Sequence, residues 1–332
     1  MKYFLLPAAL CLPVWGLLSG LANGQAAPAQ PPPSERAPPP RAANGREANI
    51  AAPNTSESSP ASRGTAASRP ATTKPSPHSL QELYQAVARS PNDIVSLQLL
   101  AEGLTGARKY EESIPIYHKL ISALDEKSKA RRTARFNLAV AMMRLGRLDQ
   151  AAEHLRVLLS EDPSFNAARY NLALVLRSQA KLEDARRHLV QVTAQAAGLP
   201  QAEAASAYGL LGEVLMDLKL PLEAMKAYGQ VAKLEPKSVP AWLNYAAAAR
   251  AAGSYGLAIV AARKACSLAP NDAGNWRLLG ELQLELYEAT KTHHFVMGAM
   301  EAFRQSLKLK PDQAEVKALI EKYAPIVPGD SG

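Results

Sequence analysis

Residues 236–280 read PKSVPAWLNYAAAARAAGSYGLAIVAARKACSLAPNDAGNWRLLG and contain one period of an internal repeat. Pro236 and Pro270 are 34 residues apart, and so are Trp242 and Trp276. A period of this length indicates a supersecondary unit that stacks on copies of itself, because one such unit cannot bury its apolar face alone.

The period continues along the chain, and superposed repeats give four columns. An apolar column consists of Leu100, Leu138, Leu172, Leu211, Tyr245 and Leu279. A column of small residues consists of Ser113, Ala151, Ala185, Ala224, Ala258 and Ala299. A third column consists of Tyr117, Leu155, Leu189, Tyr228, Ala262 and Phe303, and a fourth of Pro163, Pro236, Pro270 and Pro311.

These columns resemble the tetratricopeptide repeat, whose pattern W-x2-L-G-x2-Y, then A-x3-F, then P extends over about 34 residues. Trp276-Arg-Leu-Leu279-Gly280 fits the opening of the pattern, and Ala224-x3-Tyr228 fits its close. The small column fits positions where two helices approach to about 8–10 Å. The larger residues would fill the space between successive hairpins.

The resemblance predicts an all-α fold, a right-handed superhelical α-solenoid of about six helical hairpins over residues 79–325. The units start near residues 94, 132, 166, 205, 239 and 273, and a capping helix covers residues 312–323 before a tail at 326–332. Extra residues interrupt the register before 132, before 205 and around 285–297. The third insertion adds seven residues, about two helical turns, so we expect both helices of the last hairpin to be one turn longer. Pro115, Pro221 and Pro240 are expected in first turns of helices.

The N-terminus is typical of an export signal. Lys2 precedes an apolar run from Phe4 to Ala22, and residues 22–24, Ala-Asn-Gly, form a small-x-small cleavage pattern. The run is nearly long enough to span a bilayer, so an uncleaved anchor that holds the chain near the membrane is the alternative. We therefore predict an exported protein of the bacterial periplasm or cell envelope, secreted or anchored in the inner membrane.

Residues 25–78 are rich in proline, alanine and serine, and Ile50 is their only large aliphatic residue. Such a segment cannot bury enough apolar area to offset about 1–2 kcal/mol of backbone entropy per ordered residue. The sequence predicts a disordered linker between the signal and the repeats.

The resemblance implies that the first helix of each unit lines a concave groove that holds an extended peptide. Asn137, Asn171 and Asn244 share one column of that groove, and a carboxamide can both donate to and accept from a peptide backbone. Arg144, Arg177 and Arg250 follow one to two turns later on the same helices and would favour acidic or C-terminal segments. The alternative is that all six are solvated side chains of an exposed face.

The ladder of asparagines is incomplete. Leu99, Leu210 and Leu278 occupy the same column in the other units, where Glu102, Glu213 and Glu281 follow one turn later. The sequence therefore predicts a groove whose charge alternates in sign along its length.

Few residues suggest other chemistry. His154 and His188 are one repeat apart and are expected on the surface, and His293 and His294 lack the H-E-x-x-H spacing of a zinc site. Cys266 lies among alanines and is expected to be a packed thiol. We expect no catalytic residues, no metal and no cofactor.

The net charge of +8 first suggests nucleic acid, but part of it belongs to Lys2 and the basic linker, so we expect no nucleic-acid partner. The sequence predicts a non-catalytic scaffold of the cell envelope that binds a protein or peptide partner in the groove. The alternative is a structural scaffold that associates with itself through the last hairpin and has no groove ligand.

Overall fold

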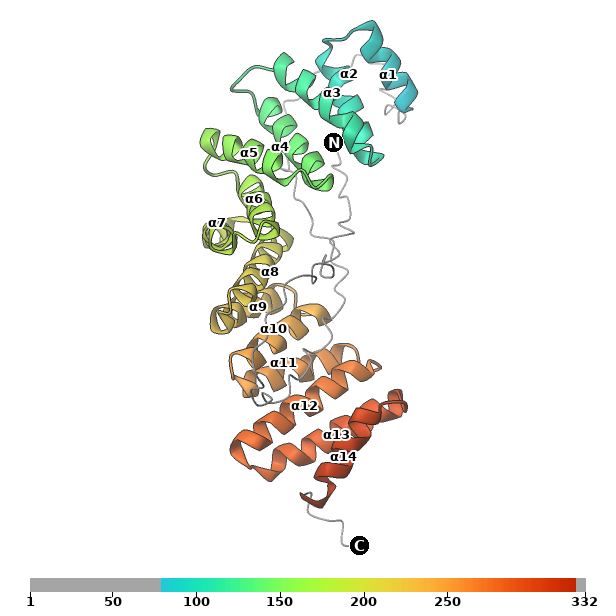
Figure 1. The fold of residues 1–332 in the computed structure, drawn as a ribbon, viewed down its shortest axis with the longest axis vertical. Helices are drawn as coiled ribbons and strands as arrows, with labels where there is room; N and C mark the ends of the chain where they lie inside the picture. Colours follow the sequence, from blue (N-terminus) through green and yellow to red (C-terminus); the bar gives the residue numbers. More distant parts are fainter. Residues whose placement is uncertain (1–78, 327–332) are drawn as a thin grey trace, which may run out of the picture.

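The computed structural model describes residues 79–326, and every regular element within them is helical. The predicted signal (1–24), the predicted linker (25–78) and residues 327–332 of the predicted tail lie outside the described residues. The helices stack in chain order into an elongated array (Figure 1). The prediction of an all-α solenoid is confirmed for this part of the chain.

Six hairpins make up the array. Their first helices are α2 (Ile94–Gly106), α4 (Lys129–Arg144), α6 (Asn166–Ser178), α8 (Gln201–Asp217), α10 (Val239–Ala251) and α12 (Ala273–Thr290). Their second helices are α3 (Tyr110–Ala123), α5 (Leu148–Glu161), α7 (Leu182–Ala194), α9 (Pro221–Leu234), α11 (Tyr255–Leu268) and α13 (His293–Leu309). Helix α1 (Leu80–Arg89) precedes them and α14 (Ala314–Tyr323) follows, with short 3-10 turns at Ala196–Gly198 and Ala324–Ile326.

The insertions lengthen helices. Helices α4 and α8 begin at Lys129 and Gln201, ahead of the unit starts expected at 132 and 205. Helices α12 and α13 contain 18 and 17 residues, compared with 13 and 14 in α10 and α11, which confirms the longer last hairpin.

Local signals place the helix starts. Ser79 and Glu82 form a capping box at α1, with backbone-to-side-chain distances of 3.1 and 3.3 Å. Pro221 is the first residue of α9, where its missing N–H has no intrahelical partner to lose. Pro115 was expected in such a position, but α3 begins at Tyr110 and the proline lies inside the helix. That prediction was wrong, because α3 begins three residues before Ser113, as the next four second helices begin three residues before their small residue, and this start places Pro115 in the second turn.

The turn inside each of the first five hairpins uses the left-handed backbone region at one equivalent position. Gly146 and Gly253 have φ of 73° and 70° there, while Arg108, Ala180 and Lys219 have φ of 61°, 58° and 62°. Non-glycine residues are strained in this region by about 1–2 kcal/mol. The hairpin geometry therefore imposes the left-handed conformation even where the residue is not glycine and the conformation is unfavourable.

The small column lies in the core. Ser113 and the five alanines of that column are all 0% exposed. Closer approaches occur in two of the three hairpins whose third column is aromatic: a Cβ on Gly212 would lie 2.8 Å from the ring of Tyr228, and one on Gly280 would lie 2.5 Å from the ring of Phe303. Glycine is thus required wherever these two rings lie against a first helix. The first hairpin, with Tyr117, carries Ala101 at the equivalent position.

Helix α14 closes the C-terminal end. Val316 and Tyr323 are buried against α12 and α13, and the Tyr323 hydroxyl donates to Glu288 at 2.7 Å. Within the described residues, no helix is long and apolar enough to cross a membrane.

Candidate functional site

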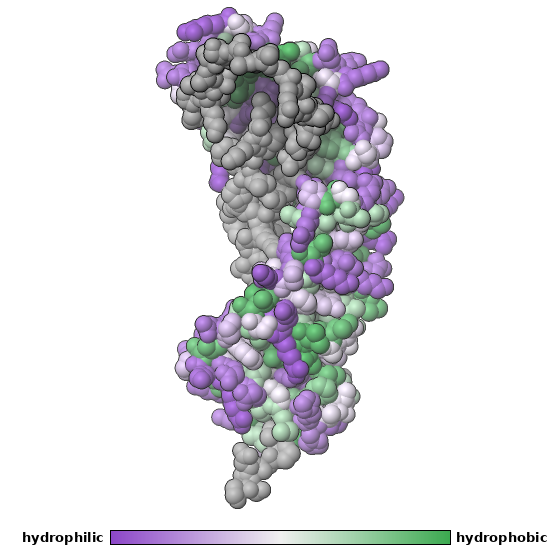
Figure 2. Space-filling model, turned by 180° about the vertical axis from the view of Figure 1, so that it is seen from behind, coloured by the Kyte–Doolittle hydropathy of each residue, from purple (hydrophilic) through white to green (hydrophobic). Residues whose placement is uncertain are grey.

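The first helices of the hairpins form one row in the array. Helices α4, α6 and α8 contact one another across the repeats, and side chains of α10, α12 and α14 are joined by ion pairs. Figure 1 shows α4, α6, α8 and α10 on the side toward which the array curves. Figure 2 shows apolar patches separated by polar side chains, without one continuous apolar strip on the face in view.

The three asparagines of the predicted site occupy different environments. Asn137 is half-buried and hydrogen-bonds to Tyr117 of the preceding hairpin. Asn171 is 0% exposed, and its Nδ2 donates to the carbonyl of Ala167 at 2.8 Å. Asn244 is half-buried and already interacts with the protein. Only Asn137 and Asn244 thus have side chains at the surface of the structure.

Arg177 joins two hairpins. Its Nη1 pairs with Glu213 and its Nε with Asp217 at 2.9 Å, both on α8. Burial alone would lower the pKa of the Arg177 guanidinium, but the charges of Glu213 and Asp217 outweigh burial and raise that pKa. The guanidinium is therefore already paired with two carboxylates of the protein itself.

Arg250 repeats this arrangement further along the array. Its guanidinium pairs with both carboxylate oxygens of Glu285 on α12, and its Nη1 lies 3.8 Å from Glu281. Arg277 pairs with Glu281 at 3.1 Å and with Glu315 on α14 at 3.4 Å. Burial raises the pKa of Glu281, although Arg277 and Arg250 oppose that shift. The charges expected to alternate along the groove therefore neutralise one another across adjacent first helices.

Arg144 is different from the other two arginines. It is half-buried at the end of α4, and within the described residues it has no carboxylate partner. It lies one position later in its repeat than Arg177 and Arg250 do in theirs, and α6 of the next hairpin carries Leu174 and Ser178 at the positions that hold Glu213 and Asp217 on α8. The charge of Arg144 is consequently available to another molecule.

Asn137 and Arg144 lie on one face of α4. They are seven residues apart, which is close to two turns of a helix and about 10 Å along its axis. An amide group and an unpaired guanidinium at this separation can contact one extended peptide together, the amide at a backbone group and the guanidinium at a carboxylate.

The sequence prediction named side chains of neighbouring first helices but missed the ion pairs between those helices. Asp217 and Glu285, which neutralise Arg177 and Arg250, were not among the predicted residues. The sequence did contain a signal for these pairs. Asp217 and Glu285 each lie in the repeat after their arginine, one position later in the repeat than the arginine itself. The same comparison would have identified Arg144 as unpaired.

Among the described residues, a histidine and a cysteine have shifted pKa values. The rings of His118 and His154 lie 6.0 Å apart, and burial, followed by the charge of His118, lowers the pKa of His154. Cys266 is buried, as predicted, and burial raises the pKa of its thiol to about 12. Within residues 79–326 no three histidine, cysteine or acidic side chains are grouped closely enough to hold a metal ion.

Comparison with known proteins agrees with this description of a helical-hairpin solenoid. Two sequence profiles of the tetratricopeptide repeat match the chain, one at residues 239–282 and the other at 99–164 and 170–238, together more than half of its length. The chain belongs to the tetratricopeptide repeat family. Members of this family are generally non-catalytic scaffolds that bind protein or peptide partners.

Several solved structures match parts of the chain. The C-terminal part of a TPR repeat-containing protein from Cytophaga hutchinsonii is 15% identical, with a TM-score of 0.58, and the match covers 73% of this chain and 93% of that chain. BtubC from P. vanneervenii is 17% identical, with a TM-score of 0.47, over 57% of this chain and 86% of its own. The MamA protein is 19% identical, with a TM-score of 0.45, over 58% of this chain and 94% of its own. No curated protein matches the chain.

Proposed function

We propose that the chain is a non-catalytic scaffold of the bacterial cell envelope that binds a partner protein or peptide on the row of first helices. The observation that carries the proposal is Arg144, whose guanidinium has no carboxylate partner within the described residues and lies on the same face of α4 as Asn137. We infer that an acidic or C-terminal segment of the partner contacts this pair.

The proposal assigns different roles to the six predicted binding residues. Asn137 and Arg144 contact the partner, and Asn244 supports a second contact further along the row. Arg177 and Arg250 act through their ion pairs, which hold neighbouring first helices together. Asn171 is buried and takes part only if the binding surface around it opens.

Variants of α4 test the site. Partner capture from the envelope fraction should fall by about tenfold for Arg144→Gln and for Asn137→Ala, since each removes a polar contact worth about 1–2 kcal/mol. Arg304→Gln removes the same charge from an exposed position on α13 and serves as the control. Equal capture by all variants would contradict the proposal, and recovery of only this chain would favour the self-associating scaffold.

The cellular location is part of the proposal and rests on residues 1–24. Export followed by cleavage after Gly24 would leave Gln25 as the first residue of the mature protein. N-terminal sequencing of the protein from fractionated cells tests this directly. An intact N-terminus in the membrane fraction indicates the uncleaved anchor, and an intact N-terminus in the cytosol would refute export.

A further inference from the structure

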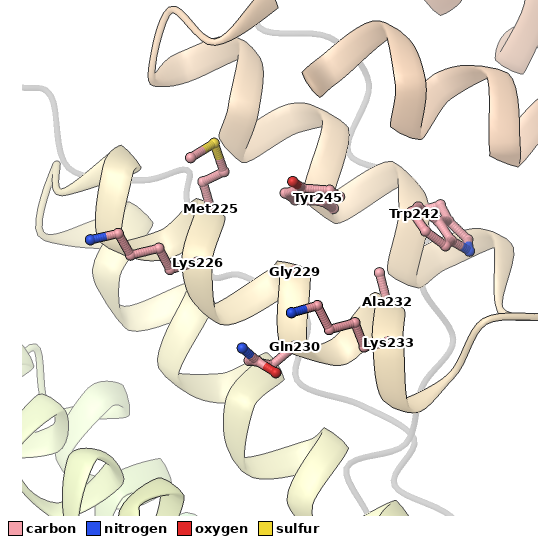
Figure 3. Close-up of a pocket in the computed structure, with 8 residues that line it drawn as sticks. All are labelled: Met225, Lys226, Gly229, Gln230, Ala232, Lys233, Trp242 and Tyr245. Carbon is pink, nitrogen blue, oxygen red and sulfur yellow. The ribbon is translucent and has the colours of Figure 1, made fainter. Parts of the chain in front are cut away.

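A recess lies between α9 and α10, away from Asn137 and Arg144. Its volume is about 280 Å³, and its walls include Met225, Lys226, Gly229 and Lys233 from α9 and Trp242 and Tyr245 from α10 (Figure 3). None of the residues that line it carries a carboxylate. We propose that this recess is a second binding site, which takes an acidic peptide segment by inserting one large apolar side chain against Trp242 and Tyr245.

The recess exists because Gly229 has no side chain. The equivalent position of the second helix in the other five hairpins always carries a larger residue, namely His118, Arg156, Val190, Arg263 or Arg304. Glycine inside a helix is about 1 kcal/mol less favourable than alanine.

Packing does not require glycine at this position. A Cβ on Gly229 would lie 3.5 Å from the Tyr245 ring, an ordinary contact, whereas a Cβ on Gly212 or Gly280 would overlap an aromatic ring. Gly229 therefore opens a space that the fold itself does not need.

The floor of the recess is aromatic and held in place. The rings of Trp242 and Tyr245 lie 6.3 Å apart at a tilt of 53°. The Trp242 indole nitrogen donates to the carbonyl of Pro236 at 3.0 Å, which fixes the ring. Within residues 79–326 the Tyr245 hydroxyl has no hydrogen-bond partner, so it is available to a ligand. A fixed aromatic surface of this kind favours one large apolar side chain.

The rim of the recess is basic. Lys226 and Lys233 are exposed, and neither has a carboxylate partner in the part of the chain that the structure describes. Figure 3 shows them on α9 to either side of Gly229. They are seven residues apart, roughly 10 Å along the helix axis. An extended peptide advances about 3.3 Å per residue, so two acidic residues three positions apart span about 10 Å and would reach both lysines. The apolar side chain that enters the recess would lie between these two acidic residues.

Binding of a defined peptide tests the proposal. The probe is a fluorescently labelled synthetic peptide with one phenylalanine between two glutamates spaced three positions apart, titrated against the full chain. Gly229→Arg introduces the side chain that the next hairpin carries at the equivalent position, Arg263, and it should lower the affinity by about tenfold although it adds a positive charge. Gly209→Arg is the matched control, because a Cβ on Gly209 meets no atom within 4 Å.

A second variant does not depend on packing. Lys226→Gln combined with Lys233→Gln changes only exposed side chains, and it should weaken binding and reduce its dependence on salt. The proposal would be overturned if the unaltered chain did not bind the peptide, or if Gly229→Arg and Gly209→Arg bound it with equal affinity. It would also be overturned if peptides in which alanine replaces phenylalanine, or lysine replaces glutamate, bound as tightly as the original peptide. The variants lie two hairpins away from Asn137 and Arg144, so these results leave the test of the proposed function at α4 unaffected.

Discussion

Gly280→Ala is expected to destabilise the last hairpin although alanine is the better helix former. The new Cβ would lie 2.5 Å from Cε1 of Phe303 and within 2.9 Å of two other ring atoms. Phe303 is 0% exposed, so its ring cannot move into solvent. Overpacking costs about 1–3 kcal/mol, and contacts this short place the cost near the upper end. Helix propensity returns about 1 kcal/mol, so we expect a net loss of about 1–2 kcal/mol in the free energy of unfolding.

Gly209→Ala is the control for this prediction. Gly209 lies inside α8, and a Cβ there meets no atom within 4 Å. The same substitution should therefore stabilise the protein by about 0.5–1 kcal/mol through helix propensity alone. The structure thus predicts opposite signs for one chemical change at two helical positions.

A second substitution should restore the fit at Gly280. Two other hairpins combine alanine with leucine at the equivalent pair of positions, as in Ala139 with Leu155. We expect Phe303→Leu to be destabilising alone but to couple favourably with Gly280→Ala by about 1–3 kcal/mol. Urea unfolding followed by far-ultraviolet circular dichroism gives the free energies, and hydrogen exchange in α12 and α13 tests the local effect, because solenoids can unfold in parts. Equal responses at Gly280 and Gly209, or additive effects of the two substitutions, would refute the reasoning.

Three further predictions concern single side chains. Ala180→Gly should raise the free energy of unfolding by about 1 kcal/mol in urea denaturation, because Ala180 has φ of 58°; a loss of stability would show that the turn is not strained. Burial raises the pKa of the Cys266 thiol to about 12, so this thiol should react with a thiol reagent at pH 8 only after denaturation. A prompt reaction in native buffer that is absent in Cys266→Ser would contradict this burial. The folded-state pKa of His154 is lowered, so the unfolded state binds more protons, and the free energy of unfolding should decrease as the pH falls below about 6.5. His118→Gln should make that decrease smaller. An unchanged pH profile in this variant would exclude the contribution of His118.

The sequence predicted those parts of the fold that depend on repetition. The small column from Ala151 to Ala299 is buried as expected, because every hairpin meets the same steric requirement at its closest approach. The cap formed by Val316 and Tyr323 was also predicted, since it has to cover the open end of the stack. One recurring requirement, repeated six times, gives a strong signal in a single sequence.

Features that differ between repeats were harder to predict. Asn171 was expected in the groove with Asn137, but its environment depends on neighbouring side chains and it is buried. Arg177 was expected to be available to a ligand, but Glu213 on the next first helix pairs with it. Whether a groove residue is free depends on pairs of residues from adjacent repeats, and a column of equivalent positions does not contain that information.

Photocrosslinking from Ser178 tests the central functional claim most directly. Ser178 is exposed on α6 of the next hairpin, at the position in its repeat that Arg144 occupies on α4. A photoreactive amino acid there, in the full chain within cells, should crosslink to a different protein, and Arg144→Gln should remove that product. Crosslinks only between copies of this chain, or a heterologous product that Arg144→Gln leaves unchanged, would contradict partner binding on the row of first helices.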